Sequence, residues 1–221
     1  MKYKSVFDII GPVMVGPSSS HTAGAARIGR VARMMFGRQP KKAEITFYGS
    51  FAKTYKGHGS DVATVAGILD FDTFDLRLKD SLQIAKDLGI KVELRTSEVL
   101  TEHPNTSRIV LSDEEKQTEV VGVSIGGGKI EVIEINGFAF QLGFDTPTLL
   151  VLHEDRFGMI AGVAKVLTQH RINVGHMEVS RHTRGSRALM AIETDSAVSP
   201  QVLEEIRQIP GILEVSLLSL Q

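Results

Sequence analysis

The sequence contains no cysteine, and that absence removes several kinds of chemistry at once. A chain without thiols forms no disulfide and no zinc finger, offers no cysteine nucleophile, and cannot hold an iron–sulfur cluster by itself. Any cluster chemistry would therefore need ligands from another chain.

An excess of charge of one sign is also lacking, because 25 Lys and Arg residues nearly balance 26 Asp and Glu residues. The net charge of −1 gives no indication of a nucleic-acid or membrane-surface partner. Apolar runs are short, and TLLVL, residues 148–152, falls far below the length of a membrane span. The N-terminal MKYKSVFDIIGP has no extended apolar region and no small-residue cleavage site, so we expect no signal peptide and a cytoplasmic location.

The length of 221 residues suits one large domain or two small ones, and 42% apolar residues suffice for packed cores. Gly, Asp and Pro cluster in LGFDTPT, residues 142–148, which is the candidate joint. We expect a first domain at 1–145 and a second at 148–221. The second region predicts the order βαββαβ, a ferredoxin-like unit, from strands at 149–155, 172–181, 187–195 and 212–220 and helices at 157–170 and from Ser199 or Pro200 to Pro210.

The first region predicts a mixture of helices and strands, and hence an α+β fold class for the chain. Apolar spacing and end signals predict helices at 22–35, at 60–69 with Ser60 as N-cap, and from Asp72 or Asp75 to Gly89. Alternation predicts strands at 44–51, 91–96, 106–112, 118–125 and 129–135. Asn136-Gly137 predicts a hairpin into FAFQL, residues 138–142.

The segment GPSSSHTAG, residues 16–24, places three serines before an expected helix. A serine at the N-cap satisfies one free amide, and the remaining amides, the helix dipole and further hydroxyls favour an anion such as a carboxylate or phosphate. The segment is neither a Walker loop nor a nucleophile elbow. The alternative is capping by one serine beside two solvated neighbours.

Two further segments carry histidines next to small or turn-forming residues. In KGHGSD, residues 56–61, His58 lies between two glycines before a helix, where it can exchange a proton near pH 7 and Asp61 can orient it. In EHPNT, residues 102–106, His103 is held extended by Pro104 and Asn105 can form an Asx turn. The alternatives are a glycine-rich turn with an exposed histidine and a plain turn.

A fourth segment, SIGGGKIEV at residues 124–132, has three glycines between two alternating strands. These glycines suit either a backbone nest for an anion or a flexible hairpin. The remaining histidines fall in the regular C-terminal region, where packing or solvation is the expected role.

Taken together, GPSSSHTAG, YGSFAKTYKGHGSD, HPNT and SIGGGKIE resemble, in order and spacing, the β chains of bacterial two-chain iron–sulfur L-serine dehydratases. The resemblance covers essentially the whole chain. The C-terminal region is similar to an ACT domain, a ferredoxin-like fold that often binds amino acids and pairs with a second copy. The first region resembles the allosteric substrate-binding type of domain also found in some phosphoglycerate dehydrogenases.

The resemblance implies conversion of L-serine to pyruvate and ammonia with a [4Fe-4S] cluster that a cysteine-bearing α chain holds. It also implies an α2β2 assembly with β–β pairing through ACT domains, and it leaves a K+ requirement open. On this reading, His58, His21 and Asp61 are the candidate catalytic residues, with His58 as general acid or base. The candidate substrate-binding residues are Ser18, Ser19, Ser20, Thr22, His103 and Asn105.

A second hypothesis belongs to a different class of protein. The chain would be a non-catalytic regulatory subunit that binds serine as an effector in its first domain, while the α chain supplies all the chemistry. The presence of both SSSHT and KGHGSD favours the catalytic hypothesis, because a pure sensor needs no two histidines at helix entrances.

Overall fold

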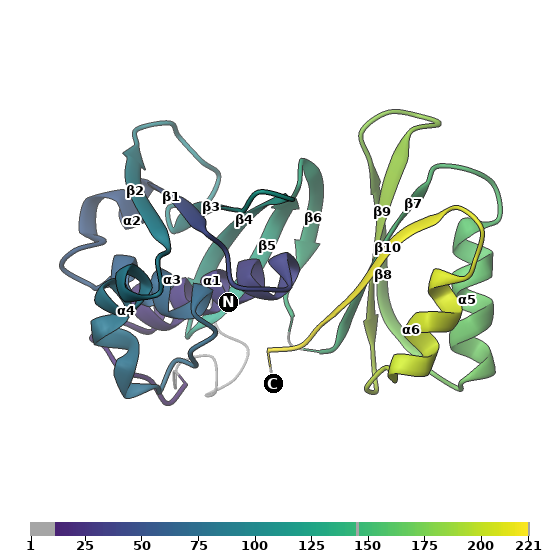
Figure 1. The fold of residues 1–221 in the computed structure, drawn as a ribbon, viewed down its shortest axis with the longest axis horizontal. Coiled ribbons are helices and arrows are strands. Elements are labelled where there is room, and N and C mark those ends of the chain that lie inside the picture. The colour runs from purple at the N-terminus through teal and green to yellow at the C-terminus, as the bar shows by residue number, and fades with distance from the viewer. Residues whose placement is uncertain (1–11, 145, 221) are drawn as a thin grey trace, which may run out of the picture. The chain divides into compact units, whose positions relative to one another are not determined.

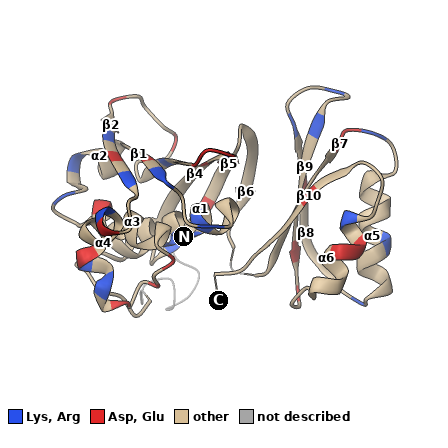
Figure 2. Ribbon diagram, viewed as in Figure 1, with Lys and Arg blue, Asp and Glu red and all other residues tan. Residues whose placement is uncertain are grey.

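The computed structural model describes residues 12–144 and 146–220 and divides the chain into two compact units, Met1–Asn136 and Gly137–Gln221. The N-terminal segment considered above as a signal peptide therefore lies almost wholly outside the described residues. Within the described ranges, no helix is both long and apolar enough to cross a membrane. Lys and Arg are interspersed with Asp and Glu over both units (Figure 2), in keeping with the small net charge.

The first unit is built on a twisted sheet with the strand order β2-β1-β3-β4-β5-β6 (Figure 1), to whose edge β6 is added from the residues directly after Asn136. Its strands are β1 Lys42–Tyr48, β2 Lys91–Ser97, β3 Thr106–Ser112, β4 Gln117–Gly126, β5 Lys129–Ile135 and β6 Phe138–Leu142. β1 pairs with β2 in parallel and with β3 antiparallel, and β3, β4 and β5 continue antiparallel. The end of β1 therefore lies between the end of β2 and the start of β3.

Helices cover one face of this sheet. They are the π-helical turn η2 Ser19–Ala23, α1 Gly24–Phe36, α2 Gly49–Thr54, α3 Ser60–Ile68, the 3-10 turn η3 Leu76–Asp80 and α4 Ser81–Asp87. α1 packs on β3 and β4 and against α3. Its buried residues recur at helical spacing, for example Ala25, Ile28 and Ala32, and Ile28 packs so closely on Gly122 of β4 that a Cβ atom there would lie 2.7 Å from its Cγ2.

The second unit contains the expected βαββαβ order and a four-stranded antiparallel sheet, β10-β7-β9-β8. Its elements are β7 Thr148–Glu154, α5 Met159–Gln169, β8 Val174–Arg181, β9 Arg187–Thr194, α6 Pro200–Arg207 and β10 Ile212–Leu218. The two helices and the sheet enclose one core that includes Val151, Val163, Ile192 and Ile206. The α+β class and the ferredoxin-like second unit are thus confirmed.

Three details of the first unit differ from the sequence-based prediction. The helix expected from Thr22 begins earlier, at Ser19, as a π-helical turn that continues into α1. The strand expected over 44–51 ends at Tyr48, because Gly49 has a φ of 53° and turns the chain into α2. Ser60 is not the N-cap of α3, since Gly59 takes that position with a φ of 66°.

The remaining turn signals gave mixed outcomes. Of the two starts proposed before Gly89, Asp75 is the capping residue, and its carboxylate accepts the amide of Arg77 at 2.9 Å ahead of η3. Asn136 and Gly137 both have positive φ, 49° and 82°, as a two-residue hairpin turn requires, and β6 follows directly. The hairpin prediction is therefore confirmed.

Candidate functional site

The SSSHT segment forms the N-cap and most of η2, and its three serines make different contacts. Ser18 is the N-cap residue, and its Oγ accepts the amide of His21 at 3.2 Å. Ser18 Oγ also lies 3.3 Å from Ser20 Oγ, which in turn lies 3.0 Å from Nδ1 of His21. Within the described residues the hydroxyl of Ser19 has no partner. Ser18 therefore caps the turn, Ser20 supports the histidine, and Ser19 offers a hydroxyl that no described residue engages.

His21 lies at the centre of the cluster, and both its ring nitrogens are engaged. Nε2 lies 3.0 Å from Oγ of Ser50, at the start of α2. The ring packs edge-on against the rings of Phe51 and His58, with centroids 5.2 and 4.7 Å away. Burial, and secondarily the neighbouring His58, lowers the pKa of His21 below its ordinary value. The ring therefore favours the neutral form, able to donate from one nitrogen and accept at the other.

His58 lies in the glycine-flanked loop between α2 and α3, and backbone contacts fix it there. Its amide donates to the carbonyl of Thr54 at 2.9 Å, and its own carbonyl accepts the hydroxyl of Thr22 at 2.9 Å. Nδ1 of His58 is buried and has no hydrogen-bond partner among the described residues. A buried ring nitrogen without a partner is costly in a folded protein, and a ligand that bonds to it would remove that cost.

The HPN segment is joined to α2 through its backbone. The carbonyl of Pro104 accepts the amides of Ser50 at 2.7 Å and of Phe51 at 3.4 Å. A Cβ atom at Gly49 would lie 2.6 Å from that carbonyl oxygen, so the close approach requires glycine there. The loop before β3 thereby fixes where Ser50 meets His21.

His103 and Asn105 stabilise this loop. The amide of Asn105 donates to Nδ1 of His103 at 3.1 Å, which places the proton of the neutral ring on Nε2. Burial lowers the pKa of His103, and Glu131 partly opposes that shift. Asn105 also donates from Nδ2 to the carbonyl of Ser124 at 3.3 Å, and its own carbonyl accepts the amide of Ser124 at 3.0 Å.

The SIGGGK turn closes the cluster against the start of α1. Its three glycines, residues 126–128, all have positive φ. The carbonyl of Gly128 accepts Nη1 of Arg27 at 2.8 Å, and a Cβ atom at Gly24 would overlap the buried Oγ of Ser124. Positive φ favours glycine at all three turn positions, and a Cβ atom at Gly128 would also lie 2.7 Å from Pro12, whereas the space around Gly126 is open.

The structure brings together most, but not all, of the predicted site residues. Ser18, Ser20, His21 and His58 form one cluster, and the hydroxyl of Thr22 is used to hold the His58 loop. Among the described residues, the Asp61 carboxylate accepts only the amide of Val62, at 2.9 Å. His103 and Asn105 connect to the cluster through the Pro104 backbone.

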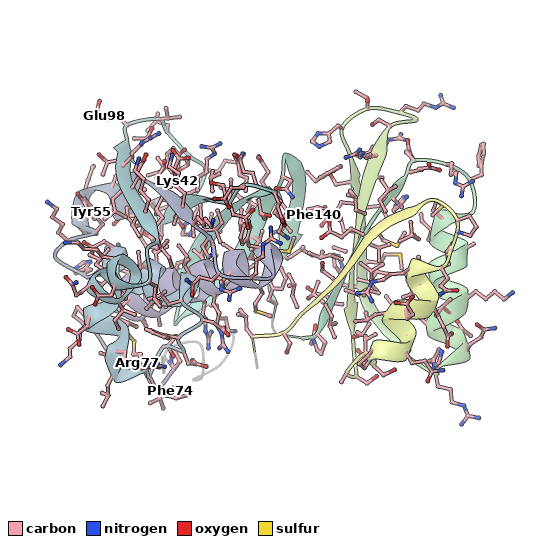
Figure 3. All side chains as sticks on the ribbon, viewed as in Figure 1. Lys42, Tyr55, Phe74, Arg77, Glu98 and Phe140 are labelled. Carbon is pink, nitrogen blue, oxygen red and sulfur yellow. The ribbon has the colours of Figure 1, made fainter. Side chains whose placement is uncertain are left out.

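Sequence reasoning missed Ser50 and Phe51, which complete the surroundings of His21. Both lie in the YGSFAKTYKGHGSD segment, but the prediction assigned them to a strand over 44–51 and therefore not to a site. A glycine followed by a serine directly after an alternating strand was the available signal. Tyr55, at the other end of α2, stacks on Phe47 with centroids 5.4 Å apart and is labelled in Figure 3.

Without cysteine, the remaining candidates for metal ligands are the Asp, Glu and His side chains. Across the described residues, no group of three or more His, Asp or Glu side chains is placed to hold a metal ion. Together with the absence of cysteine, this donor set does not fit an iron–sulfur cluster within the chain.

The sequence matches two family models and two related proteins that indicate the same family. Residues 5–88 match the family model "Serine dehydratase beta chain", and residues 147–211 match the ACT domain. The chain is 58% identical to the probable L-serine dehydratase β chain of Bacillus subtilis, over 98% of both chains. It is 36% identical to the L-serine dehydratase β chain of Peptoniphilus asaccharolyticus, over 91% of this chain and 92% of the relative.

A more distant relative is D-3-phosphoglycerate dehydrogenase of Methanocaldococcus jannaschii, 26% identical over 89% of this chain and 37% of that enzyme. The resemblance stated from the sequence motifs is thus confirmed, and this chain belongs to the family of L-serine dehydratase β chains.

Proposed function

We propose that this chain, with a cysteine-bearing partner, forms an L-serine dehydratase that releases pyruvate and ammonia. The observation that carries the proposal is the pairing of His21 and His58 beside the SSSHT serines, in a chain 58% identical to a probable L-serine dehydratase β chain. We place the reaction in the cytoplasm.

The reaction needs a base for the α proton, an acid for the β hydroxyl and a site for the carboxylate. His58 is our choice for the base, because its Nδ1 is buried without a partner whereas both nitrogens of His21 are engaged. L-Serine would lose its α proton and its hydroxyl to give aminoacrylate and water. Aminoacrylate then tautomerises to the imine, and water hydrolyses that to pyruvate and ammonia.

We assign the carboxylate to the start of η2. The hydroxyl of Ser19 and the amides of Ser19 and Ser20 have no partner in the described chain, whereas Ser18 caps the amide of His21, so these groups suit an anion. Ser18 and Ser20 support this site through their bonds to His21, and His103 and Asn105 fix the adjoining loop. The orienting role predicted for Asp61 stays a prediction, since among the described residues its carboxylate accepts only the amide of Val62, in the first turn of α3.

The cluster chemistry is assigned to the partner chain. A [4Fe-4S] cluster with an open iron supplies a Lewis acid for a leaving hydroxyl. The donor set described above does not fit such a cluster, so we derive no step of this chain through it. A K+ requirement belongs to the same proposal and is tested by replacing K+ with Na+ in the assay.

The assembly and the domain limits are further parts of the proposal. We propose domains at 1–145 and 148–221, with ACT domains pairing through an edge strand in an α2β2 enzyme. β10 and β8 are the edges of the second sheet and present backbone groups for such pairing.

The match of residues 147–211 to the ACT domain favours a second candidate function. In that case the chain is a regulatory subunit that binds an amino acid, and the partner performs the reaction alone. The relation to phosphoglycerate dehydrogenase over 89% of the chain is compatible with such a module.

Co-expression distinguishes the two functions. The chain is produced anaerobically with and without a cysteine-bearing partner, and pyruvate formation from L-serine and the cluster absorbance are measured. Activity only when both chains are present supports the proposed dehydratase. Full activity of the partner alone, merely modulated by this chain, would overturn the catalytic assignment and support the regulatory one.

A further inference from the structure

We infer that Ser50 is a positioning residue that fixes the orientation and the tautomer of the His21 ring. Its Oγ lies 3.0 Å from Nε2 of His21, although 29 residues separate the two in sequence. Ser20 Oγ lies at the same distance from Nδ1, on the other side of the ring. The imidazole is therefore held between two hydroxyls, one of them from its own turn and the other from α2.

The hydroxyl of Ser50 is placed before any ligand arrives. Gly49, with a φ of 53°, turns the chain out of β1, and the amide of Ser50 donates to Pro104 at 2.7 Å. The carbonyl of Ser50 accepts the hydroxyl of Thr54 at 2.8 Å. Because backbone contacts on both sides of Ser50 are satisfied, its side chain points to His21 without a separate ordering cost.

Hydrogen-bond contacts link four side chains in a row, in the order Ser18, Ser20, His21 and Ser50. Hydroxyl groups both donate and accept, so all the donors in this row of side chains can point toward Ser50 or all can point away from it. Each direction corresponds to one tautomer of the neutral ring. Ser50 is the last side chain of the row, and its hydroxyl is the hydrogen-bond partner of Nε2 in either tautomer.

Removal of the Ser50 hydroxyl should therefore shift the tautomer ratio of His21. In Ser50→Ala, Nδ1 still has Ser20 as a partner, whereas an N–H at Nε2 would have none. His21 is half-buried, and an N–H there without an acceptor is costlier than a bare ring nitrogen, so the proton moves toward Nδ1. We expect a change of about 2- to 10-fold in the ratio, the effect of one lost net hydrogen bond.

Nuclear magnetic resonance of the full chain with 15N-labelled histidine measures this ratio directly from the two ring nitrogens of His21. Ser50→Ala and Gly49→Ala should both shift it, the latter by displacing a hydroxyl that is still present. Ser50→Thr should restore it. Thr168→Val is the matched control, because it removes a hydroxyl that likewise donates to the carbonyl four residues earlier, but in α5 and without a bond to Ser50 or His21.

An unchanged ratio in Ser50→Ala, or an equal shift in Thr168→Val, would overturn the inference. This readout needs no catalysis, so it stands apart from the proposed function on which the role in turnover rests. With the partner chain, Ser50→Ala should lower kcat roughly 10- to 100-fold and leave KM for L-serine within about twofold, as loss of orientation does. A normal kcat despite a shifted ratio would overturn the role in turnover alone.

Discussion

At the scale of single residues, the two histidines of the cluster differ in how much of their chemistry is already committed. A serine hydroxyl lies within hydrogen-bond distance of each ring nitrogen of His21, whereas Nδ1 of His58 is buried and has no partner in the described chain. A general base must reach a substrate proton within hydrogen-bond distance, and a committed nitrogen first has to give up its bond. This difference is what separates a reacting group from a supporting one.

The first prediction concerns His58. His58→Gln keeps the side chain polar and of similar length but removes the imidazole that would accept the proton, so kcat should fall by roughly 100- to 10,000-fold. The cluster absorbance of the co-expressed enzyme should stay unchanged, because the cluster ligands lie on the partner. His176→Gln, at an exposed position of β8, is the control and should leave turnover unaltered. Wild-type turnover in His58→Gln would contradict the assignment.

The second prediction concerns pH. Burial holds the pKa of His21 and of His103 below 6.5, the value expected in the unfolded chain. Between each lowered pKa and 6.5 the unfolded state binds more protons than the folded state, so stability rises with pH in that window. The stabilisation is complete above the unfolded value and is lost as the pH falls.

Urea unfolding of the chain at several values between pH 5 and pH 8 tests this dependence. His103→Asn keeps an acceptor near the amide of Asn105 but does not titrate, so its midpoint should fall less on acidification than that of the wild type. An equal fall in both proteins would mean that His103 does not contribute.

At the scale of elements, the sequence predicts regular segments well and the site only in part. Periodicity identified both helices of the second unit and every described strand of the first. It failed at Gly49, because the alternation of β1 continues into residues that a left-handed φ turns into α2. The bond between Ser50 and His21 depends on that turn and on the position of Pro104, so no local pattern could have indicated it.

The third prediction concerns the crossing of α1 and α3. A Cβ atom at Gly67 would overlap the carbonyl of Ala26, and one at Gly29 would overlap the carbonyl of Thr64. Gly67→Ala should therefore force the helices apart and lower stability by about 1–3 kcal/mol or more. Thermal unfolding of the full chain measures the loss.

Gly162→Ala is the matched control in α5, because its Cβ would find only ordinary contact, 3.5 Å from Ile209. Alanine favours a helix over glycine, so this variant should be neutral or more stable by up to about 1 kcal/mol. If both variants lose stability equally, the close crossing of α1 and α3 does not depend on glycine.

At the scale of the whole molecule, the sheet topology explains why distant segments meet. β1 lies between parallel β2 and antiparallel β3, so the end of β1 adjoins the start of β3. That arrangement brings Ser50, after β1, to Pro104, before β3. Because α1 packs on β3 and β4, the SSSHT turn that precedes α1 lies beside Ser50 as well. Order along the chain and strand order together make the site.

The last prediction concerns the independence of the second unit. Its core is formed entirely by its own residues, namely Leu149, Val151, Val163, Val166, Leu167, Met190, Ile192, Val198, Val202, Ile206 and Val215. A fragment of residues 146–221 should therefore fold by itself and melt cooperatively in circular dichroism. Units of this size bury a limited core, so a single cavity matters: Ile206→Ala should cost about 2–5 kcal/mol in the fragment.

The same substitution in the full chain shows whether the units unfold together. If they are independent domains, Ile206→Ala lowers one of two transitions and leaves the other unchanged, because a contact inside one core stabilises only that core. A fragment without a cooperative melt would instead mean that folding of this region needs residues before 146. The proposed boundary at 145–148 would then divide a single folding unit.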